Sequence, residues 1–278
     1  MRPFIALWIV ASIWAGATGV RAADGLAAME GLQLWLDAAD PATIQIEEGR
    51  VARWKDKSPK GFDAVQTNAA ARPTFLPQAF GKMPMLHFEQ GGQWMATDCV
   101  PARGQDPRTI LVVVAHLKEC ERALLAHVVH YGSPVDEMAY GITYRGWKSV
   151  NWGNHYWHGS MNSGIPTDSG GGYIVVASYA DRADNFAVNG GPTYRADAAW
   201  PMGALDTAGA SDRVHGLAIG GGLNGGAGTW GDIGEVLAFN RVLTLGELRK
   251  LEGHLAHKWG MTDVLPAGHP FKTQRPAP

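Results

Sequence analysis

Aromatic, amide and imidazole side chains are concentrated in one short segment, residues 144–162. Its candidate ligand-binding residues are Trp147, Asn151, Trp152, Asn154, His155, Tyr156, Trp157 and His158. Sugars present apolar C–H faces that stack on aromatic rings, while nearby polar groups bind their hydroxyls. In an extended chain Trp152 and Tyr156 lie on one face, and Trp147 and Trp157 on the other. The segment therefore predicts a carbohydrate-binding surface, with packing of these rings in the core as the alternative.

Aspartate residues mark several predicted loops, at Asp37, Asp40, Asp56, Asp206 and Asp212. Calcium takes about six to eight oxygen ligands, and these loops are possible contributors. No EF-hand-like run is present. Side-chain capping of tight turns is the interpretation that the pattern favours, and calcium stays open as a possible cofactor.

The chain contains two cysteines, Cys99 and Cys120. In an oxidising compartment the pair is able to form one disulfide, which would close a loop of about twenty residues. Two free buried thiols are the alternative. A structural zinc site is not expected, because no cysteine or histidine spacing of that kind surrounds the pair.

The first residues have the pattern of a signal peptide. Arg2 precedes an apolar run at residues 4–17, and small residues lead up to Ala23. We therefore expect residues 1–23 to be removed, which predicts a secreted, periplasmic or cell-surface protein with no further membrane span. An uncleaved anchor is the alternative. The formal net charge of −2 and the absence of a Lys/Arg block argue against nucleic-acid binding.

The elements that position these residues are mostly strands. Apolar and polar residues alternate in many short runs separated by glycine-containing turns, which predicts an antiparallel β-sandwich. The continuous apolar run at residues 109–117 predicts a central strand that is covered on both faces. Gly91 and Gly92, between residues 85–88 and 93–97, predict a hairpin.

One segment near the end of the chain has helical spacing. Thr244 and Glu247 form a capping-box pattern, and leucines follow on one face up to Trp259. We predict a single α-helix over residues 245–259. It completes one domain at residues 24–272, with a loose tail at 273–278.

Several segments together resemble the LamG-like, concanavalin A-like jelly-roll domains of exported bacterial proteins. They lie at residues 31–38, 51–56, 85–88, 186–190, 231–241 and 255–260, in the order typical of that family. The resemblance implies an all-β, antiparallel jelly-roll sandwich with one C-terminal helix. It does not imply one function, because lectins, adhesion modules, glycanases and lyases share this fold.

Glucanases of this fold carry the motif E-x-D-x-x-E, and retaining cleavage needs two carboxyl groups about 5 Å apart. The nearest match here has Trp230 in the first position, followed by Asp232 and Glu235. In a regular strand Asp232 and Glu235 point to opposite faces. We therefore predict a structural role for both and assign no catalytic residue. A lyase would need a base such as His155 or Tyr156, but no lyase motif is recognisable.

These observations favour an exported, non-catalytic module that binds carbohydrate or a surface polymer, with a polysaccharide or cell-surface glycan as its partner. Two alternatives remain. One is a polysaccharide-active enzyme, either a lyase or a diverged glycanase. The other is a structural or adhesion protein without a small ligand.

Overall fold

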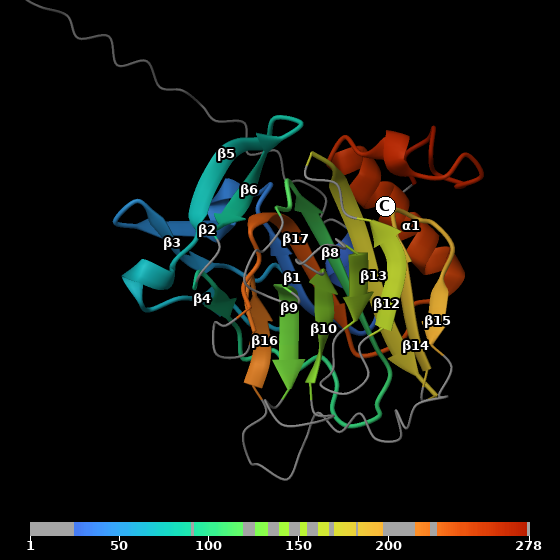
Figure 1. The fold of residues 1–278 in the computed structure, drawn as a ribbon, viewed down its shortest axis with the longest axis horizontal. Helices are drawn as coiled ribbons and strands as arrows, with labels where there is room; N and C mark the ends of the chain where they lie inside the picture. Colours follow the sequence, from blue (N-terminus) through green and yellow to red (C-terminus); the bar gives the residue numbers. More distant parts are fainter. Residues whose placement is uncertain are drawn as a thin grey trace, which may run out of the picture.

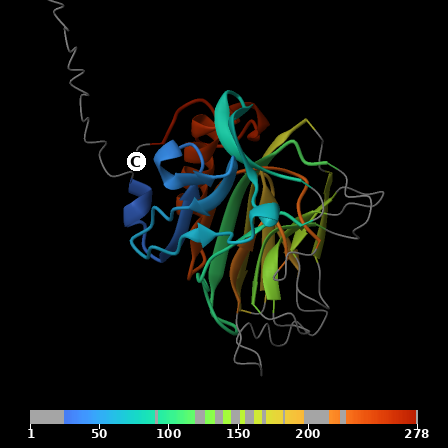
Figure 2. The same ribbon diagram turned by 90° about the vertical axis from the view of Figure 1, so that its left-hand side faces the viewer.

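The computed structural model describes residues 25–89, 92–118, 126–132, 139–144, 151–154, 161–166, 170–181, 183–196, 215–222 and 227–276. They form two stacked antiparallel sheets with one α-helix on the outer side of the first sheet (Figure 1). Figure 2 turns these layers side-on, with the helix, the eight-stranded sheet, and strands β9 (Ala126–Gly132) and β10 (Ala139–Tyr144) of the other sheet following one another. Within these residues no helix is long and apolar enough to span a membrane. The predicted antiparallel β-sandwich with one helix is confirmed.

Strand β17 (Gly231–Phe239) lies inside the eight-stranded sheet. One of its edges pairs with β8, and its other edge pairs with β6 over its first residues and with β1 over the later ones. The strands of this sheet, from one edge to the other, are β15 (Tyr194–Ala196), β14 (Ala183–Val188), β13 (Gly172–Ala180), β8 (Arg108–Ala115), β17 (Gly231–Phe239), β6 (Met83–Phe88) and β5 (Thr74–Phe80), with β1 (Leu32–Asp37) beside β17.

The nine-stranded sheet lies against it. In spatial order its strands are β12 (Met161–Pro166), β11 (Asn151–Asn154), β10 (Ala139–Tyr144), β9 (Ala126–Gly132), β16 (His215–Ile219), β7 (Met95–Ala96), β4 (Ala64–Val65), β3 (Arg50–Trp54) and β2 (Ile44–Glu47). Four short 3-10 turns complete the described elements, at Gly25–Ala28, Pro41–Thr43, Ala69–Ala71 and Thr262–Val264.

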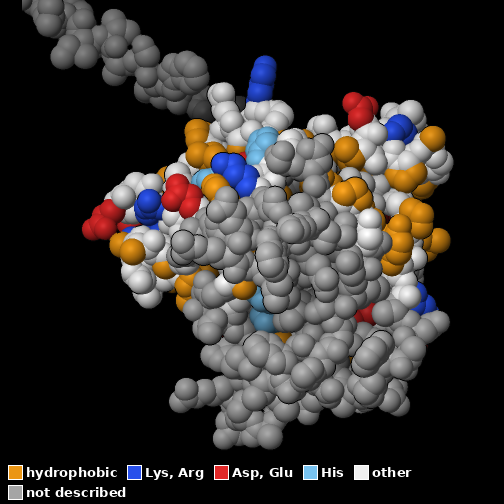
Figure 3. Space-filling view, viewed as in Figure 1, with side chains coloured by type: hydrophobic (Ala, Val, Ile, Leu, Met, Phe, Trp, Pro, Cys, Tyr) orange, Lys and Arg blue, Asp and Glu red, His pale blue; other side chains and the backbone are white. Residues whose placement is uncertain are grey.

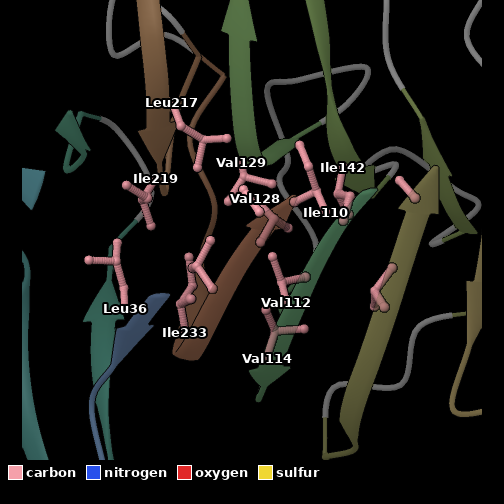
Figure 4. Packing of buried hydrophobic residues seen from close by; sticks show 14 of the residues in the cluster. Leu36, Ile110, Val112, Val114, Val128, Val129, Ile142, Leu217, Ile219 and Ile233 are labelled. Atoms are coloured by element: carbon pink, nitrogen blue, oxygen red, sulfur yellow. The ribbon is translucent and has the colours of Figure 1, made fainter. Parts of the chain in front are cut away.

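The main core fills the space between the sheets. Alternate residues of β8 point into it, among them Ile110 and Val112, and they meet Val128 of β9 and Ile219 of β16 (Figure 4). The other residues of β8, such as Leu111, face the helix layer instead. Because both faces are covered, the strand shows no apolar/polar alternation, as the run at residues 109–117 predicted.

The helix α1 (Leu245–Lys258) begins at the predicted capping box. Thr244 accepts a hydrogen bond from the Glu247 backbone, and the Glu247 carboxylate accepts one from the Thr244 backbone. The predicted end was one residue too late, because Trp259 is the C-cap. Leu255 and Trp259 are fully buried against the outer face of the eight-stranded sheet.

The predicted hairpin at Gly91 and Gly92 is wrong. Strand β6 belongs to the eight-stranded sheet, whereas β7 belongs to the nine-stranded sheet, so the chain crosses between sheets at this point. The hairpin that does form joins β5 to β6 through Gly81 and Lys82, with φ values of 56° and 69°. Both residues take the left-handed conformation that two-residue hairpin turns require. Gly92 has a φ of 129°, which favours glycine, but the two strands on either side of this segment belong to different sheets.

Candidate functional site

The segment predicted to bind carbohydrate joins the nine-stranded sheet. Asn151, Trp152 and Asn154 lie in β11, which pairs with β10 on one side and β12 on the other. Only the backbone of these three residues is described. The remaining predicted ligands, Trp147, His155, Tyr156, Trp157 and His158, lie outside the described residues. The exposure of the aromatic rings therefore stays a prediction.

A pocket of about 320 Å³ lies near the other edge of the same sheet, over β2, β3 and β4. It is lined by Gln45, Glu47, Ala52, Arg53, Val65, Gln66, Thr67 and Arg72. Strand register explains part of this lining, because Gln45 is paired with Arg53 and Arg53 with Val65 across neighbouring strands. Cross-strand partners point to the same face of a sheet. The sequence analysis did not predict this pocket.

Ion pairs and hydrogen bonds hold the polar lining in place. Glu47 accepts a hydrogen bond from Gln45 Nε2 at 3.0 Å and pairs with Arg72 Nη2 at 2.8 Å. Arg53 Nη1 lies 2.8 Å from Asp63, and the Arg53 side chain keeps 43% of its surface exposed. In Figure 3 acidic and basic side chains alternate over the region that β2 and β3 occupy in Figure 1. The pocket thus combines fixed polar groups with two small apolar residues, Ala52 and Val65.

The row of paired residues continues from the pocket towards the centre of the sheet. Val65 is paired with Ala96, Ala96 with Ala218, and Ala218 with His130. The ring of His130 stacks on His127 with centroids 4.2 Å apart, and both side chains are buried. The pocket and the predicted aromatic segment thus belong to one sheet, towards its opposite edges.

A second polar group, here called the histidine–aspartate cluster, consists of His87, His116 and Asp232. Asp232 Oδ1 lies 2.6 Å from His87 Nδ1, and Oδ2 lies 2.7 Å from His116 Nδ1. The carboxylate is 3% exposed, whereas the two imidazoles are 23% and 39% exposed. A buried carboxylate therefore orients two accessible rings, and their Nε2 atoms have no partner among the described residues.

Strand pairing explains how the cluster forms. Asp232 is paired with His87 of β6 on one side and with Ala115 of β8 on the other, and His116 follows directly. His116 has a φ of 52°, a left-handed conformation that costs a non-glycine residue on the order of 1 kcal/mol. Figure 3 shows histidine side chains beside lysine or arginine side chains over the region of β6. The residues are up to 145 positions apart in the chain, so no local sequence pattern predicts the cluster.

The prediction that Asp232 and Glu235 point to opposite faces is wrong. The register of β17 with β8 shifts between Ile233 and Glu235, which places a bulge at Gly234. A bulge inserts one extra residue and reverses the alternation that follows it. A Cβ on Gly234 would lie 2.6 Å from the Trp259 ring, so this position is open only to glycine. Both carboxylates consequently lie on the helix-facing side of the sheet.

Glu235 nevertheless belongs to a buried ionic network. Its carboxylate accepts hydrogen bonds of 2.7 Å each from Lys258 Nζ and from the indole N–H groups of Trp35 and Trp259. Lys258 also bonds to Asp37 at 2.7 Å. Burial raises the pKa of Glu235, and the positive charge of Lys258 acts in the opposite direction. These contacts join β1, β17 and α1 and leave no oxygen of Glu235 for a substrate, so the predicted structural role fits the geometry.

The described aspartates do not fit a calcium site. Asp56 caps a turn, with its carboxylate accepting the backbone N–H groups of Trp35, Ser58 and Phe62. Asp37 and Asp40 both pair with Lys57. Within the described part of the chain no group of three or more His, Cys, Asp or Glu side chains is arranged to hold a metal ion. Asp206 and Asp212 lie outside it.

Cys99 is buried, and burial raises the pKa of its thiol. Its sulfur lies 3.8 Å from the backbone oxygen of Gln33. Cys120 lies outside the described residues, so its pairing with Cys99 stays a prediction.

Comparisons with known proteins establish the fold. No protein-family model matches the sequence, and no curated protein matches it. Among solved structures, a Trypanosoma rangeli sialidase in complex with 2,3-difluoro-KDN has a TM-score of 0.56 and 20% identity, over 83% of this chain and 33% of the sialidase. A mutant of that sialidase displaying trans-sialidase activity has a TM-score of 0.54 and 18% identity, over 85% of this chain and 34% of the mutant.

The carbohydrate-binding module CBM40 of a Ruminococcus gnavus IT-sialidase, bound to alpha2,3 sialyllactose, has a TM-score of 0.44 and 12% identity, over 59% of this chain and 93% of the module. That similarity is too low to carry an argument. The chain spans about a third of the length of the T. rangeli sialidases. At this level of identity they share with the chain a β-sandwich fold, and the fold alone.

Proposed function

We propose that this protein is an exported β-sandwich that binds a carbohydrate or a surface polymer without cleaving it. The observation that carries the proposal is the pocket over β2, β3 and β4, with its volume of about 320 Å³ and its fixed polar lining. Ligand sites in proteins are typically concave, with volumes from roughly 300 Å³ upward and a few well-placed polar groups. This pocket meets both conditions.

The lining has the chemistry that a sugar requires. Ala52 and Val65 offer an apolar surface to C–H groups, and Arg53, Gln45 and Thr67 offer hydrogen-bonding groups to hydroxyls. The predicted aromatic segment enters the same sheet through β11, towards its opposite edge. Sialidases of similar fold were solved with sialic acid, which is in keeping with a carbohydrate ligand although the similarity itself concerns the fold.

Filling the pocket tests this proposal. In Val65→Trp an indole ring would occupy the space between β3 and the neighbouring strands. We expect it to weaken binding of the tightest glycan on an array at least tenfold. The matched control is Ile46→Trp, because Ile46 lies on β2, is 51% exposed and does not line the pocket. Unchanged binding by Val65→Trp, or no glycan binding by the wild type, would contradict the proposal.

The histidine–aspartate cluster favours a second candidate, a polysaccharide-active enzyme. An imidazole oriented by a carboxylate, with its other nitrogen accessible, is the usual arrangement of a general base. Under the leading proposal, incubation with a polysaccharide panel yields neither new reducing ends nor unsaturated products. Product formation that disappears in His116→Ala would instead favour the enzyme.

A further inference from the structure

We infer that the pocket over β2, β3 and β4 prefers an acidic sugar, one that carries a carboxylate, over a neutral sugar. This inference rests on the proposed function and names the ligand class of the same site. It follows from which polar atoms of the lining are already engaged and which are not.

Most hydrogen-bond acceptors of the pocket lining are already bonded to other protein groups. Both carboxylate oxygens of Glu47 are bonded, one to Gln45 and one to Arg72. Gln66 accepts from the Asn68 backbone through its side-chain oxygen and donates to the Trp94 oxygen. Its backbone oxygen accepts from Arg72 Nε. Gln45 Oε1 and the Thr67 hydroxyl oxygen are the side-chain acceptors that remain in the described lining.

The donors, in contrast, are partly unengaged. Arg53 uses Nη1 for Asp63, which leaves Nε and Nη2 without a partner among the described residues. Arg72 uses Nε and Nη2, which leaves Nη1. The Thr67 hydroxyl is a further donor at the pocket wall. The pocket therefore offers more donors than acceptors, and two of its donors are cationic.

A carboxylate ligand matches this excess of hydrogen-bond donors. It is a donor-free ligand with two oxygens, and the planar edge of a guanidinium binds it through two parallel N–H···O hydrogen bonds. Arg53 is the side chain suited to this contact, because it is 43% exposed and Asp63 already holds its other edge. Arg72 is only 10% exposed and its charge is paired with Glu47, so Arg53 is the cation that a ligand would meet. A neutral sugar would leave the Arg53 edge without an ionic partner.

The test compares polysaccharides that differ only in their carboxylates. Pectate, alginate and hyaluronate are each titrated beside their carboxyl-reduced forms, by calorimetry at low salt. We expect at least one native polymer to bind tenfold or more tightly than its reduced form. Arg53→Gln is expected to abolish that difference, because it weakens binding of the native form more than binding of the reduced form, and Arg53→Lys is expected to retain part of the difference. Lys60→Gln removes a positive charge outside the pocket and should behave like the wild type.

The outcomes separate the two proposals. Equal binding of native and reduced polymers would overturn the acidic-sugar inference and leave carbohydrate binding standing. A carboxylate preference that survives in Arg53→Gln would also overturn it, because another site would then be responsible. If no polymer in either form binds, and the glycan array is also blank, the proposed function falls together with the inference.

Discussion

Replacing Lys258 by methionine is expected to lower the free energy of unfolding by about 3–5 kcal/mol, because it leaves buried carboxylates without their shared cation. Lys258 Nζ lies 2.7 Å from both Asp37 and Glu235, and its own side chain is only 15% exposed. Asp37 retains Lys57 at 2.9 Å, but Glu235 has no other cation among the described residues. Urea denaturation followed by tryptophan fluorescence measures the change.

Two controls separate the ionic effect from the loss of the side chain. Lys250→Met, on the exposed side of α1, should change stability by no more than about 0.5 kcal/mol. Adding Glu235→Gln to Lys258→Met removes the stranded charge and keeps a side-chain oxygen that accepts from one of the two indoles, which bond to different oxygens of Glu235. The double variant should therefore be more stable than Lys258→Met alone. A double variant that is less stable would contradict the network described here.

Replacing Arg108 by methionine is expected to have a comparable effect, a loss of about 3–5 kcal/mol. Arg108 is fully buried at one end of the inter-sheet core, with its guanidinium carbon 5.2–5.9 Å from the ring centroids of three tyrosines. It donates a hydrogen bond of 2.6 Å to the hydroxyl of one of them, Tyr131. Burial, and after it the charge of the fully buried Asp184, raises the pKa of Tyr140.

The reason is that Arg108 and the three tyrosines around it form a cluster in which every residue is only 0–1% exposed. Burial raises the pKa of Tyr131 to about 12, against the opposing charge of Arg108. Arg108→Met would leave the Tyr131 hydroxyl and the backbone oxygens of Gly104 and Asp106 without the guanidinium that donates to them. Arg108→Lys keeps the charge but loses the planar donors, so a smaller loss is expected. Thermal unfolding of Arg108→Met within about 5 °C of the wild type would show that the cluster contributes little.

The sequence predicted the fold best where a single local pattern determines the structure of a segment. The unbroken apolar run of β8 required cover on both faces, and Thr244 with Glu247 satisfied the first backbone groups of α1. Pairing partners and register were less predictable. The bulge at Gly234 depends on the Trp259 ring that packs against it, and no pattern within β17 reveals that contact.

The candidate site was harder to predict for a related reason. The pocket lies over β2, β3 and β4, which pair in chain order, but Gln66, Thr67 and Arg72, which complete its lining, lie outside the strands, where no strand pattern predicts their position. Asp232 meets His87 and His116 only because β17 lies between β6 and β8. Residue types suggested aromatic stacking at residues 144–162, but the contacts that define a site come from neighbours far away in the sequence.

The most direct test of carbohydrate binding at the pocket is amide hydrogen exchange with and without the tightest-binding glycan of the array. We predict slower exchange on binding over Ile44–Glu47, Arg50–Trp54 and Ala64–Val65, and no change around Asp232. Slower exchange confined to His87, His116 and Asp232, with none over β2, β3 and β4, would contradict the account and place the ligand at the histidine–aspartate cluster.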